Sequence, residues 1–533
     1  MRNIFFVFLF VFQWITAQED ARIFFTDKPN AQFYMDNPLS MLTQRALDRR
    51  IAQNIPLTLN DVPLESSYRD AVINANGIVY KAESKWMNCV HVRGSVQDIQ
   101  ALLSLPFVHH IEFANPALNA KSNSAPLNQL STYKTNEVQT SYNYGNATTQ
   151  VQMLNTQVLH QANFTGTGKV IAVLDSGFLG VNTAAPFQRL FTNNLLLGGY
   201  NYVSQSSDIF SLHNHGTLVL SAMGAYSEGQ LVGTAPSASY YLFITEDVVE
   251  ENPVEESYWV QAAEEADRLG ADIITSSLGY FQYDNLNYSY TYASMTGDSA
   301  FASKGVNIAF SKGMLVVVSA GNSGNSTEPH VGVPAEATHA LAVGAVDSAE
   351  FRASFSSIGP SFDGRIKPDV MALGVGSAVA NPQGNFTYVS GTSLACPILS
   401  GSIACLWSAF PQLTNQQVLD LVKQSADRFT NPNNQYGYGI PDFNLAYANA
   451  LHSVSFMDSQ FQIAPNPVGD QFAVHGLTSV ATLQLVNALG QIVLEHEIHP
   501  NENIVAVDAI PRGIYSYQIK QNHHVITGKI IKK

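Results

Sequence analysis

The middle of the chain contains uninterrupted apolar runs that lead to a polar residue. Residues 170–174 are all apolar and are followed by Asp175, and residues 314–318 are apolar and lead to Asn322. Such a run is typical of a strand buried on both faces, as in a parallel sheet. We therefore expect these strands to deliver a carboxylate and an amide to the carboxyl edge of such a sheet.

Two predicted helices begin at residues that can carry out chemistry. His215 opens a segment rich in small residues, and Ser393 opens a segment that runs towards Phe410. The first N–H groups of a helix are unpaired and carry a partial positive charge, so a hydroxyl there can attack a carbonyl while a neighbouring N–H receives the oxyanion. Each residue also has a plain structural interpretation, because polar side chains often cap helix starts and Asp175 can open an ordinary turn.

Three local sequences, taken together, favour the chemical interpretation. They are Asp-Ser-Gly at 175–177, His-Gly-Thr-x-Val at 215–219 and Gly-Thr-Ser-x-Ala-x-Pro at 391–397. Their order along the chain is one of those known for a serine–histidine–aspartate triad. With these motifs, residues 166–451 resemble the subtilisin-like serine peptidases, or subtilases. The resemblance implies an α/β fold, a three-layer sandwich with a mostly parallel sheet.

The resemblance also implies a role for each residue. Ser393 is the expected nucleophile, and His215 is the base that takes its proton and returns it to the leaving amine. Asp175 is expected to orient the imidazole, and Asn322 to donate a hydrogen bond to the oxyanion. His213 competes with His215 for the role of base. The glycine after His215 favours His215, because it lets the helix backbone approach the site closely.

A further segment, 270–279, is similar to the subtilase strand that pairs with the substrate backbone. Ser277, Leu278 and Gly279 are then expected to bind a peptide by strand addition. A plain core strand is the alternative, since residues 273–274 are apolar. The tyrosine-rich segment 280–298 could line a substrate cleft, but we favour the interpretation that it covers the surface.

The N-terminal region predicts an exported precursor. Residues 1–17 combine Arg2, an apolar stretch and a small-residue end, which is typical of a secretory signal peptide. Residues 18–125 resemble the inhibitory propeptides of subtilases, with strand, strand, helix and strand between 78 and 113. An unrelated N-terminal domain is the alternative. We expect the polar stretch 115–146 to be the linker that is cut, and residues 126–455 to form the catalytic domain.

The C-terminal region, residues 456–533, alternates short strands with turns and predicts a small β-sandwich. Pro-Asn-Pro at 465–467, an Asn-x-x-Gly turn and a basic end resemble the C-terminal sorting domain of proteins exported by the type IX system of Bacteroidetes. This implies the secretion machinery as a partner and a secreted or cell-surface location. A carbohydrate- or surface-binding β module is the alternative.

Composition limits the remaining possibilities. A formal net charge of −15 argues against a nucleic-acid partner. After residue 17 we expect no transmembrane segment. We expect no disulfide, because Cys396 and Cys405 lie about 13 Å apart along one predicted helix. Catalysis is expected to need no metal or other cofactor. Structural calcium, which many subtilases bind, stays open, although no loop carries a known calcium pattern.

These observations predict a secreted serine endopeptidase that acts on protein and peptide substrates and is made as an inactive preproenzyme, with its own propeptide as inhibitor. The alternative is a catalytically inactive, subtilase-like surface adhesin or binding protein. The presence of Asp175, His215, Asn322 and Ser393 argues against that alternative.

Overall fold

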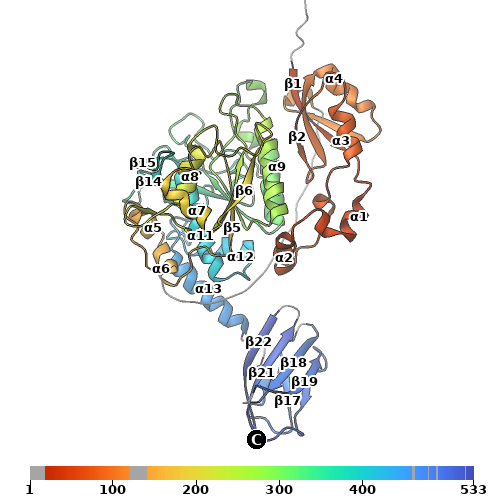
Figure 1. The fold of residues 1–533 in the computed structure, drawn as a ribbon, viewed down its shortest axis with the longest axis vertical. Coiled ribbons are helices and arrows are strands. Elements are labelled where there is room, and N and C mark those ends of the chain that lie inside the picture. Colours follow the sequence, from red (N-terminus) through yellow and green to blue (C-terminus); the bar gives the residue numbers. More distant parts are fainter. Residues whose placement is uncertain (1–17, 120–140, 459–461, 478, 488–489, 522–523) are drawn as a thin grey trace, which may run out of the picture. The chain divides into compact units, whose positions relative to one another are not determined.

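The computed structural model describes residues 18–119, 141–458, 462–477, 479–487, 490–521 and 524–533 (Figure 1). The predicted signal peptide, residues 1–17, and most of the predicted linker lie outside the described residues. The chain divides into two compact units, Met1–Ala446 and Tyr447–Lys533. The first unit therefore contains the predicted propeptide together with most of the predicted catalytic domain.

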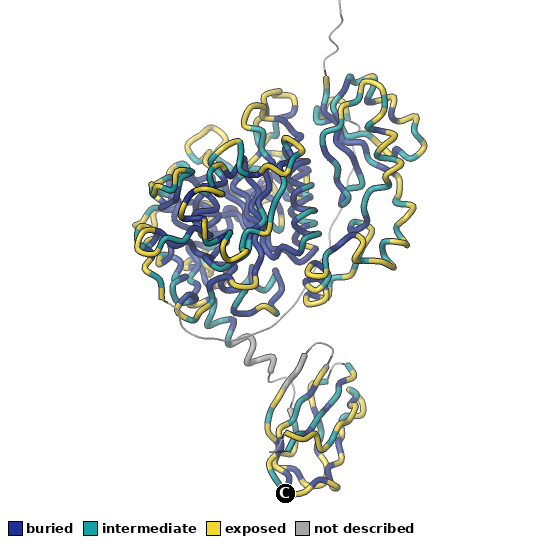
Figure 2. Tube along the Cα trace, in the orientation of Figure 1, coloured by how far each residue is buried: buried dark blue, intermediate teal, exposed yellow. Residues whose placement is uncertain are grey.

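The centre of the first unit is a sheet whose described strands, seven in number, are all parallel. Their order is β13-β12-β11-β10-β5-β9-β6. Most of these strands are buried along their whole length (Figure 2), which is why they read as continuous apolar runs. The strands are β5 (Val170–Asp175), β6 (Leu196–Asn201), β9 (Ser239–Ile244), β10 (Ile273–Ser276), β11 (Leu315–Ser319), β12 (Ala340–Val346) and β13 (Val370–Leu373).

Helices cover both faces of this sheet. Helices α8 (His215–Gly224) and α11 (Thr392–Ala409) pack against each other on one face, and α9 (Val254–Leu269) and α10 (Phe301–Ser311) do so on the other. This arrangement confirms the predicted three-layer α/β sandwich. Strand β5 lies between β9 and β10, so the chain switches direction across the sheet there, and ligands commonly bind at the carboxyl ends of the strands at such a point.

The remaining elements of this unit lie around these layers. They are the helices α5 (Thr148–Met153), α6 (Thr156–Gln161), α7 (Gln188–Thr192), α12 (Asn415–Gln424) and α13 (Phe443–Asp458), which runs on into the second unit, and the strand pairs β7 (Tyr226–Ser227) with β8 (Leu231–Val232) and β14 (Ser377–Ala380) with β15 (Phe386–Val389).

Helix α11 meets the length and hydropathy expected of a membrane span, and it is the one helix of the described residues that does so. By length and hydropathy alone, our expectation that no segment after residue 17 could span a membrane is therefore wrong. The helix is 89% buried inside the protein, however. Its apolar composition therefore reflects packing against the sheet and α8 in the core.

The predicted propeptide contains a four-stranded antiparallel sheet in the order β2-β3-β1-β4. Strands β2 (Val79–Ser84), β3 (Cys89–Ser95) and β4 (Val108–Phe113), with helix α4 (Val96–Ala101), match the predicted order of strand, strand, helix and strand. Four elements were not predicted, namely the central strand β1 (Gln18–Phe25) and the helices α1 (Ala31–Asp36), α2 (Gln44–Ala52) and α3 (Ser66–Ile73). Both faces of β1 are covered, so the alternation of apolar and polar residues that marks an exposed strand is weak there.

One face of this N-terminal sheet packs on α9 (Figure 1), and its Trp86 and Cys89 share a hydrophobic core with Trp259 of that helix. Glu264, also on α9, accepts three hydrogen bonds from residues 84–86. The donors are Ser84 Oγ at 2.6 Å and the backbone N–H groups of residues 85 and 86, both at 2.9 Å. Burial raises the pKa of Glu264 to about 6, although these donors favour the charged form.

The second unit is a small β-sandwich, as predicted. One described sheet has the order β16-β17-β20 and the other β19-β18-β21-β22, and residues from both form one hydrophobic core. Five of the strands lie where the sequence predicts short strands, at 482–486, 491–497, 504–507, 514–519 and 525–530, and β16 and β17 were not predicted. The strands are β16 (Gln462–Ala464), β17 (Gln471–His475), β18 (Ala481–Val486), β19 (Ile492–Ile498), β20 (Ile504–Ala506), β21 (Gly513–Gln521) and β22 (His524–Lys532).

Candidate active site

Asp175 and His215 form a close pair at the carboxyl edge of the large sheet. Asp175 is the last residue of β5 and is fully buried, and His215 is the first residue of α8. His215 Nδ1 lies 2.7 Å from Asp175 Oδ1. The negative charge of Asp175 raises the pKa of His215 above its ordinary value and outweighs burial, which lowers it. The pair thus holds a basic imidazole in a fixed orientation.

The structure brings His215, and not His213, to this carboxylate. A Cβ atom on Gly216 would lie 2.6 Å from the carbonyl oxygen of Gly177, so only glycine allows α8 to approach the end of β5 so closely. His213 Nδ1 accepts a hydrogen bond from the His215 N–H at 3.3 Å. His213 therefore caps the start of α8, which is the plain structural role for a polar residue at that place.

Ser393 lies in the first turn of α11, and its carbonyl is held by Ser277. Pro397 is inside this helix and has no N–H, so the Ser393 carbonyl lacks the helical partner four residues on. Ser277 Oγ donates a hydrogen bond to that carbonyl at 2.8 Å. The side chain of Ser277, which we predicted to take part in substrate binding through its segment, therefore positions the residue expected to be the nucleophile.

Asn322 lies beside the start of the same helix. Its Oδ1 accepts hydrogen bonds from Thr392 N and Thr392 Oγ1, both at 3.0 Å. Because a backbone N–H can only donate, these bonds fix which atom of the amide is oxygen and leave Nδ2 as the free donor. The point where Gly391 would carry a Cβ atom lies 3.7 Å from Ser393 N and 3.8 Å from both Asn322 Nδ2 and Ser393 Oγ. One hydroxyl and two N–H donors thus converge on a single small space.

Ser393 and His215 are not hydrogen-bonded to each other in the described part of the chain. Both stand in the first turn of their helices, α11 and α8, which pack together on the same face of the sheet. Catalytic hydrogen bonds are often long before substrate binds and tighten afterwards. The arrangement is therefore compatible with transfer of the Ser393 proton to His215.

A cavity of about 220 Å³ opens beside Ser393 and Asn322. Leu278 and Gly279 form part of its wall, directly after β10. The pairing of β10 with its neighbours stops at Ser276, and among the described residues the peptide groups of Leu278 and Gly279 have no backbone partner. The cavity thus has an open strand edge along one side, next to the expected nucleophile.

Most of the tyrosine-rich segment 280–298 packs on α9 and away from this cavity. Tyr283 and Tyr290 donate hydrogen bonds to Glu256 Oε1 at 3.0 and 2.7 Å, and Tyr288 donates to Glu19 of the N-terminal sheet at 2.8 Å. At its start, residues 280 and 281 do line the cavity. This agrees with a covering role for most of the segment.

Glu246 is a residue of this site that the sequence analysis missed. It follows the carboxyl end of β9, and Tyr280 in the cavity wall donates a hydrogen bond to it at 2.6 Å. Burial raises the pKa of Glu246 to about 8 against the effect of that bond, and Glu251 and Asp175 raise it further. Its charge in turn raises the pKa of His215. The sequence signal that could have identified Glu246 is its place two residues after the apolar strand β9.

In the part of the chain that the structure describes, no three His, Cys, Asp or Glu side chains are grouped to hold a metal ion. Cys89, Cys396 and Cys405 are free and buried. Burial raises the pKa of Cys396 to about 11, and its Sγ lies 3.5 Å from the Val317 carbonyl oxygen. Cys396 is therefore a core residue rather than a nucleophile.

Replacing Ser277 by alanine should destabilise the first unit and lower turnover. The part-buried carbonyl of Ser393 would lose its hydrogen-bond donor, which usually costs about 1–3 kcal/mol of unfolding free energy. Urea unfolding followed by tryptophan fluorescence measures this, because the second unit contains no tryptophan. The control is Ser311→Ala, since Ser311 donates to a carbonyl at an exposed end of α10, and it should cost less than about 0.5 kcal/mol. Equal losses would contradict the prediction.

Comparison with known families covers most of the chain. The subtilase family, peptidase S8, matches residues 166–439. A Bacteroidota propeptide domain of peptidase S8 matches residues 20–129, and a secretion system C-terminal sorting domain matches residues 462–533. These matches confirm the predicted propeptide and sorting domain, and they indicate a secreted or cell-surface protein.

Individual relatives agree with the family match. Subtilisin NAT of Bacillus subtilis subsp. natto and subtilisin E of Bacillus subtilis (strain 168) are each 31% identical over 299 residues, which cover 56% of this chain and 70% of either protein. A thermostable alkaline protease of Halalkalibacterium halodurans is 28% identical over 294 residues, or 54% of this chain and 70% of that protein. The chain therefore belongs to the subtilase family and is a serine endopeptidase with a propeptide and a sorting domain.

Proposed function

We propose that the chain is exported as an inactive precursor and, once processed, hydrolyses peptide bonds through an ester on Ser393. The observation that carries this proposal is the 2.7 Å contact between His215 Nδ1 and Asp175 Oδ1 at the start of α8. At the same edge of the sheet, the hydroxyl of Ser393 and the Nδ2 of Asn322 converge on one space. This geometry supports the proposed roles of His215 as base, Ser393 as nucleophile, and the Ser393 N–H and Asn322 Nδ2 as oxyanion donors.

Acyl transfer on these groups proceeds in two halves. In the first, the Ser393 oxygen bonds to the carbonyl carbon of the substrate and its proton moves to His215 Nε2. The resulting oxyanion accepts hydrogen bonds from the Ser393 N–H and from Asn322 Nδ2. The C–N bond then breaks as His215 gives its proton to the leaving amine. In the second half, water attacks the ester in the same way, with His215 again as base.

Asp175 stabilises this cycle without taking the proton. Its carboxylate holds the Nδ1–H tautomer of His215 and stabilises the imidazolium that forms in each half-reaction. The chemistry uses these side chains and water and assigns no step to a metal ion. Calcium, if this chain binds it, would have a structural role.

The substrate is proposed to bind as an added strand beside Leu278 and Gly279. Their unpaired peptide groups offer main-chain hydrogen bonds that any extended peptide can satisfy, while the cavity next to Ser393 receives one side chain. This binding mode supports a peptidase that acts on protein and peptide substrates.

The regions outside the catalytic domain support export as a precursor. The propeptide packs on α9 and shares its core, and it is proposed to keep the enzyme inactive until residues between it and the catalytic domain are cut. The proposed signal peptide, residues 1–17, starts export, and the sorting domain directs the later step. An inactive surface-binding protein is the second candidate, and the experiment below separates the two.

A serine-directed fluorophosphonate probe should label the processed wild-type protein. Labelling requires a serine oxygen activated by a base, so the Ser393→Ala variant should lose it completely. Ser390→Ala is a matched control, because Ser390 lies three residues away and its side chain accepts a hydrogen bond from Gly376 N. Labelling is measured by gel fluorescence and by mass spectrometry of the modified peptide. Correctly processed wild-type protein that takes up no probe would favour the inactive binding protein.

Asn322→Ala should lower kcat by about 10²–10³-fold with little change in KM, because the lost donor acts mainly on the transition state. This range comes from a subtilisin, which is a relative of this chain. Steady-state kinetics on a chromogenic peptide measure both parameters. A rise in KM alone would assign Asn322 to substrate binding and would contradict the proposed role.

The loss of activity at low pH should reflect protonation of His215. Only neutral imidazole can take the Ser393 proton, and Asp175 raises the pKa of His215 above 6.5. We therefore expect kcat/KM to fall as the pH drops through a value above 6.5. Asp175→Asn removes that charge, so the fall should move to lower pH, and kcat should drop about 10⁴-fold. An acid limb that stays in place in Asp175→Asn would contradict the assignment.

A further inference from the structure

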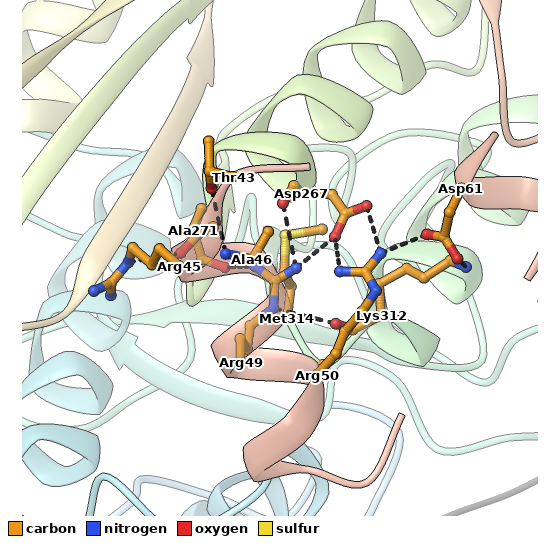
Figure 3. A network of polar contacts seen from close by, with 12 residues as sticks. Thr43, Arg45, Ala46, Arg49, Arg50, Asp61, Asp267, Ala271, Lys312 and Met314 are labelled. Carbon is orange, nitrogen blue, oxygen red and sulfur yellow. Dashed lines mark hydrogen bonds and ion pairs between the residues drawn. The ribbon is translucent and has the colours of Figure 1, made fainter. Parts of the chain in front are cut away.

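The propeptide makes a second contact with the catalytic domain at the edge of the sheet opposite the candidate active site. Its helix α2 lies against the end of α9 and the turn after α10, which precede β10 and β11 (Figure 3). Thr43 N donates to the Arg268 carbonyl at 3.0 Å, and Gln53 Nε2 donates to the Gly313 carbonyl at 2.9 Å. Since the candidate site lies at the carboxyl ends of these strands, α2 and the candidate site are at opposite edges of the sheet.

Three arginines of α2 make this contact. Arg50 binds both carboxylate oxygens of Asp267, with Nη1–Oδ1 and Nη2–Oδ2 distances of 2.9 Å. Arg49 also pairs with Asp267, and it donates to the carbonyl oxygens of Ala271 and, at 3.2 Å, of Lys312. Arg45 donates to the carbonyl oxygen of residue 270 at 2.9 Å and pairs with the Asp272 carboxylate.

The catalytic domain supplies a surface suited to guanidinium groups. Helix α9 ends at Gly270 in a left-handed conformation, with φ of 86°, and its negative end faces α2. The carbonyl groups of residues 268, 270 and 271 at this end accept hydrogen bonds from α2 and from the residue before it. Asp267 and Asp272 add two carboxylates. Such a set of acceptors matches the rigid fork of arginine better than the point charge of lysine.

At Arg49 and Arg50 the contact is buried, and its charges are paired. Arg50 is 2% exposed and Asp267 is fully buried. Asp61 of the propeptide, also fully buried, accepts from Arg50 at 2.6 Å and from Lys312 Nζ of the catalytic domain at 2.9 Å. Breaking one partner of such a pair is strongly unfavourable, because it leaves a buried charge without compensation.

We propose that the end of α9 is an arginine-binding exosite, which α2 occupies in the precursor and which the processed enzyme presents to arginine-bearing helical peptides. The proposal rests on the proposed removal of the propeptide. In the precursor the exosite works independently of the active site, so a propeptide cut at its linker stays attached through a second contact that keeps its effective concentration high.

The first test measures how fast the propeptide leaves. In full-length Ser393→Ala protein, a cleavage sequence for a specific protease is inserted between residues 120 and 140, the chain is cut, and release is followed by size-exclusion chromatography. Arg49→Met with Arg50→Met on the propeptide, or Asp267→Asn on the catalytic domain, should speed release by about 100-fold or more. Circular dichroism of the uncut chains checks folding, and the propeptide variant provides the test if Asp267→Asn does not fold.

A control variant and a combined variant make this release test specific to the contact between α2 and α9. Arg69→Met removes partly exposed ion pairs with Asp70 on α3 and with Glu83 on β2 of the same propeptide, and it should change the release rate less than about twofold. Combining the variants of both sides should add little to either alone, because the contact is already broken. Release at the wild-type rate in folded variants of either side would overturn the proposal.

The second test uses a labelled peptide of residues 41–62 and processed wild-type enzyme. The peptide should bind, as measured by fluorescence anisotropy, without slowing hydrolysis of a small chromogenic substrate, and the peptide with Arg49→Met and Arg50→Met should not bind. Absence of binding, or competition with the substrate, would overturn the exosite. The anisotropy measurement is repeated on Ser393→Ala protein that has been cut and freed of its propeptide. Peptide binding to this protein does not depend on catalysis, so the measurement distinguishes a failure of the exosite proposal from a failure of the catalytic proposal.

Discussion

The position of the expected nucleophile depends on one backbone carbonyl that its own helix cannot satisfy. Proline at 397 offers no N–H to the carbonyl of Ser393, so the partner must come from elsewhere. Ser277 provides it at 2.8 Å and thereby attaches the start of α11 to the carboxyl end of β10. Because β10 is the parallel neighbour of β5 and β11, this attachment also brings Ser393 to the edge where Asp175 and Asn322 lie.

The large sheet and the four expected catalytic residues could be predicted because each has a local sequence signal. An apolar run before Asp175 and another before Asn322 indicate buried strands, and both are strands in the structure. His215 and Ser393 begin helices where small residues allow close packing. In a parallel sheet the carboxyl ends of the strands meet at one edge, so local signals were enough to predict that these residues lie at that edge.

The rest could not be predicted, because it depends on contacts between distant parts of the chain. Arg49 and Arg50 look like ordinary surface residues of a polar helix, since charged side chains are rarely buried. Only the meeting with Asp267, more than two hundred residues away, makes them interior groups. Likewise, the motif at 391–397 contains Ser393 but gives no sign that Ser277 supports it, and Glu246 carries no pattern that links it to Tyr280.

Two acids on α9 differ in how they would fare once the propeptide departs. Glu256 keeps donors that belong to the catalytic domain, namely Tyr283, Tyr290 and the N–H of Ala302. The three donors to Glu264 all belong to residues 84–86. Water must therefore take over every bond to Glu264, while Glu256 loses its ion pair with Arg22 of the propeptide and keeps its three hydrogen-bond donors. Departure of the propeptide thus leaves one acid of this helix bonded to water alone and the other still bonded within its own domain.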